Sequence, residues 1–364
     1  MNLTFLKNKE MAILCGTGGV GKTTTSAALA LAAALDGRRV GLITIDPARR
    51  LATSLGLNQL RSEPQSLNAH IEKEVGKGKL KGSLSAMMLD SENTFYKFLK
   101  KVGGAEIHDK FRDSTLFEVI AGNFGGAHDF LAMEKLYELH SSGKFDLLVL
   151  DTPPARHTLD FLDAPEHIEK FFDDRIFAWF LTDPRTSGIA ERVRAKGAKV
   201  ALGVLEKLTG EGVIKDFVSL SPHIYQVKNA FVERQKHIRN LLTSERAGAV
   251  FVSSPTDLSR GEARPFLQDA QAKGIEILAF IVNRSLRHLA PEEEPRGLKS
   301  VPLPVADNYR RLRFLVKEEE KNLRLLQELA GRSGGSKPPV LTAPELEKDV
   351  HDLPGLLTLA EILS

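Results

Sequence analysis

The chain has 364 residues, of which 42% are hydrophobic and 27% charged, a composition typical of soluble globular proteins that bury a substantial core. Its 50 basic and 47 acidic residues give a net charge of only +3, so the sequence disfavours nucleic acid as the main partner. Its one cysteine, Cys15, excludes an intramolecular disulfide and any metal site built from several thiolates of one chain.

The amino-terminal segment lacks the apolar core of a signal peptide. No stretch reaches the roughly 18 apolar residues that would span a bilayer. We therefore expect a cytoplasmic protein without a transmembrane segment.

Short apolar runs alternate with longer segments of helical period, a pattern typical of βαβ units. The runs are nearly continuous in apolar residues, as expected for strands that are covered on both faces. They lie at residues 11–15, 40–45, 145–150, 249–252 and 277–282. The sequence therefore predicts one α/β domain over residues 1–364, built on a doubly wound, mostly parallel sheet.

Two intervals between these runs are far longer than one crossover helix needs. We expect them to hold an inserted helical subdomain, with insertions at about residues 90–130 and 160–242. One apolar stripe of helical period in the second insertion is either the core of the subdomain or the lining of a groove for an apolar helix or lipid-like client. This stripe comprises Ile168, Phe171, Phe172, Ile176, Trp179 and Phe180, and a second one comprises Ile224, Val227, Phe231, Ile238 and Leu241.

Residues 312–329 have the pattern of a charged helix. The Gly, Ser and Pro residues of the segment 331–339 predict a flexible connector after that helix.

Residues 16–23 fit the P-loop pattern of phosphate-binding proteins. They follow the first predicted strand and open an Ala-rich helix predicted at 23–35, so backbone N–H groups and the helix dipole would face one anion. Lys22 would reach the outer phosphates and the Thr23 hydroxyl would bind magnesium; the alternative is a plain glycine-rich turn. The expected phosphate contacts are Gly16, Thr17, Gly18, Gly19, Val20, Gly21, Lys22, Thr23 and Thr24.

Two aspartates follow predicted strands. Asp46 comes after the strand at 40–45, and Asp151 comes after the strand at 145–150. Ligands of doubly wound sheets bind beyond the carboxyl ends of the strands, so both carboxylates would face the phosphates. An aspartate after a strand is otherwise a turn or cap residue. Together with the P-loop, the two aspartates predict hydrolysis of a nucleotide triphosphate with a metal ion.

Five motifs, taken in order, resemble those of the arsenical-pump and tail-anchored-protein-targeting ATPases, which have a deviant P-loop. The resemblance covers most of the chain. It implies a dimeric switch that binds ATP or ADP with Mg²⁺, hydrolyses ATP and couples the nucleotide state to movement of a client-binding helical subdomain. The motifs lie at residues 18–24, 46–48, 151–159, 262–264 and 281–283.

The resemblance also implies roles for single residues. Asp46 would polarise the attacking water and lie near the metal, and Asp151 would lie near magnesium in the second switch. Asn283 would contact the adenine ring, with a strand-end turn as the alternative. Residues 340–364 resemble a loop that packs beside the base from Pro344 onwards, followed by a closing helix.

The P-loop departs from the family at Thr17, where members usually carry a second lysine that reaches the partner subunit's nucleotide. A hydroxyl cannot supply the charge that stabilises a transferring phosphoryl group. Either hydrolysis is slow, or Arg49 or Arg156 substitutes, or a related subunit supplies the charge. A nucleotide-gated binding scaffold with little hydrolysis, paired with a paralogue, is therefore the alternative function.

Cys15 bears on two further family functions. Arsenite-activated members sense the metalloid through three thiolates, and eukaryotic targeting members join their dimers through zinc on paired Cys-x-x-Cys motifs. With Cys15 alone, an arsenite-efflux motor is disfavoured, and a dimer would close by other contacts. We expect Cys15 to be a small core residue.

Overall fold

The computed structural model describes residues 3–46, 50–112, 114, 127–153, 159, 211–255, 257–290, 298, 301–331 and 337–363. The chain divides into two compact units. The first unit comprises Met1–Leu89, Ser142–Leu159 and Leu241–Ser364, and the second comprises Asp90–Ser141 and Asp160–Asn240.

The first unit is built on one sheet, in which the described residues form eight strands in the order β3-β4-β2-β5-β1-β6-β7-β8. All neighbouring strands are parallel except β3, which runs antiparallel to β4. The predicted doubly wound, mostly parallel fold is confirmed. The strands are β1 (Met11–Cys15), β2 (Arg39–Thr44), β3 (Gln65–Ser66), β4 (Ser83–Met88), β5 (Leu147–Asp151), β6 (Ala247–Ser253), β7 (Ile277–Ser285) and β8 (Val340–Pro344).

The five predicted strands lie in the middle of the sheet, where every residue of β1, β5 and β6 is buried. Their bounds shift by a few residues; Asp151, for instance, is the last residue of β5 and does not follow it. Strands β3, β4 and β8 are not predicted from the sequence, because these strands near the edges are short or alternate polar with apolar residues. The alternating segment Ser83–Met88 is half-buried, unlike the continuous apolar runs of the centre.

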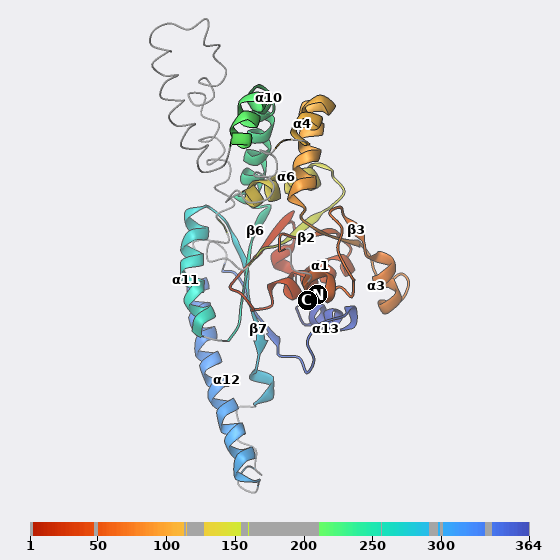
Figure 1. The fold of residues 1–364 in the computed structure, drawn as a ribbon. Coiled ribbons are helices and arrows are strands. Elements are labelled where there is room, and N and C mark those ends of the chain that lie inside the picture. The colour runs from red at the N-terminus through yellow and green to blue at the C-terminus, as the bar shows by residue number, and fades with distance from the viewer. Residues whose placement is uncertain are drawn as a thin grey trace, which may run out of the picture. The chain divides into compact units, whose positions relative to one another are not determined.

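Helices cover the sheet of the first unit in two layers (Figure 1). The Ala-rich α1 (Lys22–Leu35) packs against α13 (Leu353–Leu363) and α2 (Arg50–Ser54), and α3 (Asn68–Val75) lies beside α13. On the other side, α11 (Asp257–Ala272) packs on β6 and on the long helix α12 (Leu303–Ala330). The alanines of α1 let it approach the strands closely, and all eight residues from Ala27 to Ala34 are buried.

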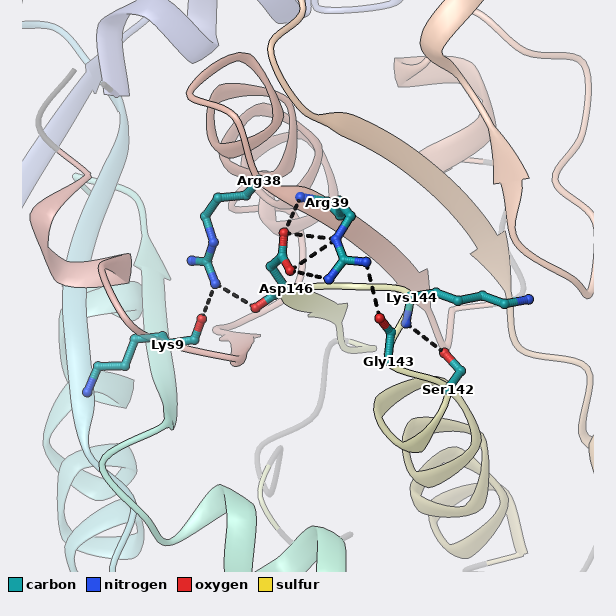
Figure 2. A network of polar contacts seen from close by, with 7 residues as sticks. All are labelled: Lys9, Arg38, Arg39, Ser142, Gly143, Lys144 and Asp146. Atoms are coloured by element: carbon teal, nitrogen blue, oxygen red, sulfur yellow. Dashed lines mark hydrogen bonds and ion pairs between the residues drawn. The ribbon is translucent and has the colours of Figure 1, made fainter.

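Arginines tie the amino-terminal edge of the sheet together (Figure 2). The Arg38 guanidinium donates to the carbonyl oxygens of Leu6 at 2.9 Å, Asp146 at 2.6 Å and Lys9. The neighbouring Arg39 binds the Asp146 carboxylate through its backbone N–H and its guanidinium, and these bonds hold the pKa of Asp146 below its usual range. The network joins the segment before β1 to β2 and β5 at the edge opposite the P-loop.

The second unit is helical in its described part, with α4 (Ser91–Arg112), α6 (Ala127–Ser141) and α10 (Glu211–Leu242), the last two residues of α10 belonging to the first unit. Its core includes Phe98, Phe111 and Leu131. The predicted positions Val227 and Phe231 of α10 lie in this core, and Ile238 and Leu241 are also buried. The stripe from Ile168 to Phe180 lies outside the described residues.

A buried ion pair lies in the second unit. The guanidinium of Arg234 bonds to the carboxylate of Glu134 and lies over the rings of Phe98 and Tyr137, 5.3 and 5.0 Å from their centroids. Burial raises the pKa of Glu134 to about 7, although Arg234 opposes this shift. Among the described helices, none combines the length and apolar character needed to cross a bilayer.

Candidate nucleotide site

The P-loop connects β1 to α1 at the carboxyl edge of the sheet. Two of its glycines are required by the backbone. A side chain at Gly16 would place its Cβ 2.1 Å from the carbonyl oxygen of Val252, and Gly21, which precedes α1, has a φ of +90°. Both positions therefore exclude other residues, and the loop lies directly on β6.

Lys22 is the first residue of α1 and is buried. Its ammonium group donates hydrogen bonds to the carbonyl oxygens of Gly16 at 2.8 Å and Thr17 at 2.9 Å. Burial lowers the pKa of Lys22, and the charges of Asp151 and Asp46 oppose that shift. The ammonium group of Lys22 therefore lies against the P-loop, where a bound anion would contact it.

Asp151 lies beside the P-loop because β5 pairs with both β1 and β2, in a register that places Asp151 opposite Leu14 and Thr44. The carboxylate is fully buried and accepts hydrogen bonds from the hydroxyl groups of Ser26 at 3.2 Å, Thr44 at 3.0 Å and Thr23. Burial raises the pKa of Asp151 to about 6, and the hydroxyl groups oppose this shift. Thr23 and Asp151, both predicted near magnesium, are thus in contact.

Asp46 lies just beyond β2 and lines the cavity described below. Its backbone N–H donates to the Thr44 hydroxyl oxygen at 3.2 Å, so this one hydroxyl contacts both aspartates. The carboxylate also lies 3.9 Å from the guanidinium of Arg50, one helical turn along the chain. Asp46 and Asp151 therefore meet at one edge of the sheet, as the strand-end argument predicts.

Asn283 is near the carboxyl end of β7 and is nearly buried. Its side-chain amide donates a 3.0 Å hydrogen bond to the carbonyl oxygen of Val20, so in this arrangement the amide holds the P-loop. A Cβ on Gly21 would lie 2.2 Å from the Asn283 amide nitrogen. Asn283 also lines the cavity, which keeps its predicted contact with an adenine ring within reach.

A cavity of about 590 Å³ opens over these residues. The P-loop, the segment after β2 and the chain after β8 surround it, and basic and acidic side chains line the last of these walls. The lining residues include Gly19, Gly21, Lys22, Thr23, Thr24, Asp46, Arg50, Thr152, Asn283, Arg284, Pro344, Glu345, Lys348, Asp349 and His351.

The remaining predicted residues divide into two groups. Gly16, Thr17, Gly18 and Val20 belong to the described loop, whereas Arg49 and Arg156 lie outside the described residues. Ser26 and Thr44, two of the three hydroxyl partners of Asp151, are not predicted from the sequence. Two signals could have found them: Ser26 follows Lys22 by one helical turn, and Thr44 ends a strand two residues before Asp46.

A glycine-rich loop between a central strand and a helix, with a buried aspartate on the adjacent strand, defines a P-loop nucleotide-binding protein of the α/β class. The family model for anion-transporting ATPases matches residues 9–297. The chain belongs to this family, and the resemblance found in the sequence is confirmed.

Three relatives show the breadth of the similarity. A putative arsenical pump-driving ATPase 1 of Aquifex aeolicus is 24% identical over 97% of this chain and 78% of that protein. An ATPase ASNA1 homolog of Babesia bovis is 26% identical over 79% of this chain and 70% of that protein. An ATPase ARSA1 of Chlamydomonas reinhardtii is 24% identical over 81% of this chain but only 40% of its own length.

Proposed function

We propose that this chain binds ATP with Mg²⁺ in the cavity over the P-loop and hydrolyses the β–γ bond. The contact between Thr23 and the buried carboxylate of Asp151, beside the ammonium group of Lys22, carries the proposal. It gathers a hydroxyl, a carboxylate and a cation at the start of α1, where the helix dipole favours an anion. Family membership supports the same activity.

The donor set fits magnesium better than a transition metal. The described residues contain no group of three or more His, Cys, Asp or Glu side chains that could hold a metal ion. Magnesium needs few protein ligands, because it keeps several waters and binds substrate phosphates. We assign it to the Thr23 hydroxyl with Asp151 and Asp46 nearby. When bound, it would neutralise charge on the β- and γ-phosphates.

Other residues of the chain would orient the phosphates, polarise the attacking water and contact the base. The backbone N–H groups of the P-loop would orient the phosphates, and Lys22 would exchange its carbonyl partners for the outer phosphate oxygens. Asp46, placed at the cavity by Thr44, would polarise the attacking water. Asn283 would position the loop and contact the base.

We further propose that the protein works in the cytoplasm as a dimer whose ATP-dependent closure moves the helical insertions at about 90–130 and 160–242, which would bind an apolar client. Two ATPase subunits meeting at their nucleotides would bring Arg49 or Arg156 toward the phosphates, in place of the lysine absent at position 17. Residues 340–364 would close the base side of the site, since Pro344 lines the cavity.

The alternative is a binding scaffold that ATP closes without turnover. Thr17 favours it, because a neutral hydroxyl there removes a positive charge worth several orders of magnitude in comparable phosphoryl transfers. In that case the hydrolysing partner would be a paralogue.

Parallel measurements of phosphate release and nucleotide binding test the proposal. We expect slow turnover of Mg·ATP, with Asp46→Asn abolishing phosphate release while nucleotide binding persists. Asp36→Asn is the matched control, because Asp36 follows the far end of α1 and is exposed. Turnover that survives Asp46→Asn removes Asp46 from the mechanism, binding without turnover supports the scaffold, and absence of binding refutes both.

A further inference from the structure

One face of α12 is apolar at regular intervals yet exposed. Leu303, Phe314 and Leu325 are 75%, 63% and 36% exposed. They are spaced by eleven residues, which is about three helical turns, so all three lie on one face of the helix. We call this face, with the charged residues between the three apolar ones, the α12 stripe.

Two side chains that lie outside this stripe fix α12 to the rest of the first unit. The buried carboxylate of Glu319 accepts hydrogen bonds from the Ser285 hydroxyl at 2.5 Å and the Leu286 N–H at 2.9 Å. Asn322 donates to the carbonyl oxygen of Pro255 at 2.8 Å. Figure 1 shows the amino-terminal part of α12 running beyond the strands of the sheet. These hydrogen bonds hold α12 in place, and the α12 stripe faces outward.

The charges of the α12 stripe also repeat every eleven residues. Asp307 lies 2.9 Å from Arg310, and Glu318 lies 3.8 Å from Lys321. Asp307, Arg310 and Lys321 are exposed, and Glu318 is partly exposed. Each acid precedes its base by three residues, so the stripe alternates apolar, acidic and basic positions and its four charges cancel.

From this pattern we propose that a second copy of this chain pairs with the α12 stripe in the antiparallel direction, about a two-fold axis at Phe314. Leu303 then lies level with the partner's Leu325, and Phe314 with the partner's Phe314. Asp307 lies level with the partner's Lys321, and Arg310 with the partner's Glu318. Every apolar residue of the stripe faces an apolar residue, and every charge is level with its opposite.

In a parallel pair in register, each charged residue would lie level with the same residue of the partner, and the repulsion between like charges is unfavourable. An anionic membrane surface would attract a basic helix, but the stripe has as many acids as bases. Self-complementarity about a two-fold axis is what an isologous interface requires. The inference deepens the proposed function, and rests on it only in choosing a second copy as the partner.

Disulfide trapping in the full-length protein tests this geometry. Phe314→Cys places two thiols at the two-fold axis, so mild oxidation should give a covalent dimer. Leu315→Cys is the matched control, because Leu315 is 51% exposed but lies off the stripe and should remain monomeric on denaturing gels. Cys15 is fully buried and should not contribute.

Charge reversal gives a second, independent test. Asp307→Lys and Lys321→Asp should each weaken the dimer about tenfold in sedimentation equilibrium, and the double exchange should restore most of the loss. A wild-type chain that stays monomeric with and without ATP, or equal cross-linking of both cysteine variants, would overturn the proposal. So would binding of a monomeric chain to phosphatidylserine vesicles that Phe314→Asp abolishes.

These outcomes are separable from those for the proposed function. A cross-linked Phe314→Cys dimer in a chain without ATP turnover leaves the interface standing and rejects the hydrolase. ATP turnover by a protein whose Phe314→Cys variant never cross-links supports the hydrolase and rejects the interface.

Discussion

The side-chain amide of Asn283 donates a 3.0 Å hydrogen bond to the carbonyl oxygen of Val20, and so joins the end of β7 to the P-loop. The two residues are 263 positions apart in the chain. The contact is close enough that the loop residue next to Val20 must be glycine, because a Cβ on Gly21 would meet the same amide. The shape of the P-loop thus depends on a strand from a distant part of the sequence.

We expect Asn283→Ala to weaken nucleotide binding about fivefold, since one hydrogen bond to the loop contributes about 1 kcal/mol. Gly21→Ala should weaken it further, because it adds both a clash and an unfavourable positive φ. Gly261→Ala is the control, as a Cβ there meets nothing within 4 Å. Isothermal titration with ADP measures each affinity, and an unchanged affinity in Gly21→Ala would contradict this account.

Thr44 should matter to turnover although it was not predicted as a site residue. Its hydroxyl contacts the Asp151 carboxylate and the Asp46 backbone N–H. Thr44→Val keeps the shape and removes both contacts, so we expect phosphate release to fall about tenfold or more. Thr44→Ser retains the hydroxyl and should stay near wild type. Equal rates in both variants would show that this hydroxyl does not position the aspartates.

The stability of the second unit should depend on pH through Glu134. Its carboxyl group ionises near 4.5 when unfolded, but burial raises its folded-state pKa to about 7. Between these values the unfolded state releases the proton first, so stability is lost as the pH rises through this window, by at most about 3 kcal/mol. Glu134→Gln cannot titrate.

Urea unfolding at pH 5.0 and 7.5 measures this effect. The wild-type chain should lose more stability between the two pH values than Glu134→Gln. Identical pH dependence of the two proteins would show that a group other than Glu134 is responsible for the loss of stability.

Cys15 should be unreactive in the folded protein. It is fully buried in β1, and burial raises the pKa of its thiol, which keeps the reactive thiolate scarce. We expect no labelling by a thiol reagent in native buffer and one equivalent in denaturant. Rapid native labelling would mean that β1 opens locally.

Much of the site could be predicted from the sequence because its signals are local. The P-loop pattern fixes a glycine-rich turn and a lysine at the start of a helix, and a buried central strand shows as a continuous apolar run. Asp46 and Asp151 followed from the general placement of ligands at the carboxyl ends of parallel strands. Strands near the edges of the sheet, such as β4 and β8, carry weaker patterns, since only part of each is buried.

What the sequence by itself determined is the class of the protein: an α/β fold with a P-loop motif, and an aspartate at or just after the end of each of two buried strands. Each of these features depends on residues close together in the chain. The tertiary structure alone decided the partners of those residues. Strand order and register bring Thr44 to Asp151 and Asn283 to Val20, and they decide which face of α12 is buried by the sheet and which faces outward. These are contacts between distant segments, and hydrophobic pattern and spacing along the chain do not encode them residue by residue.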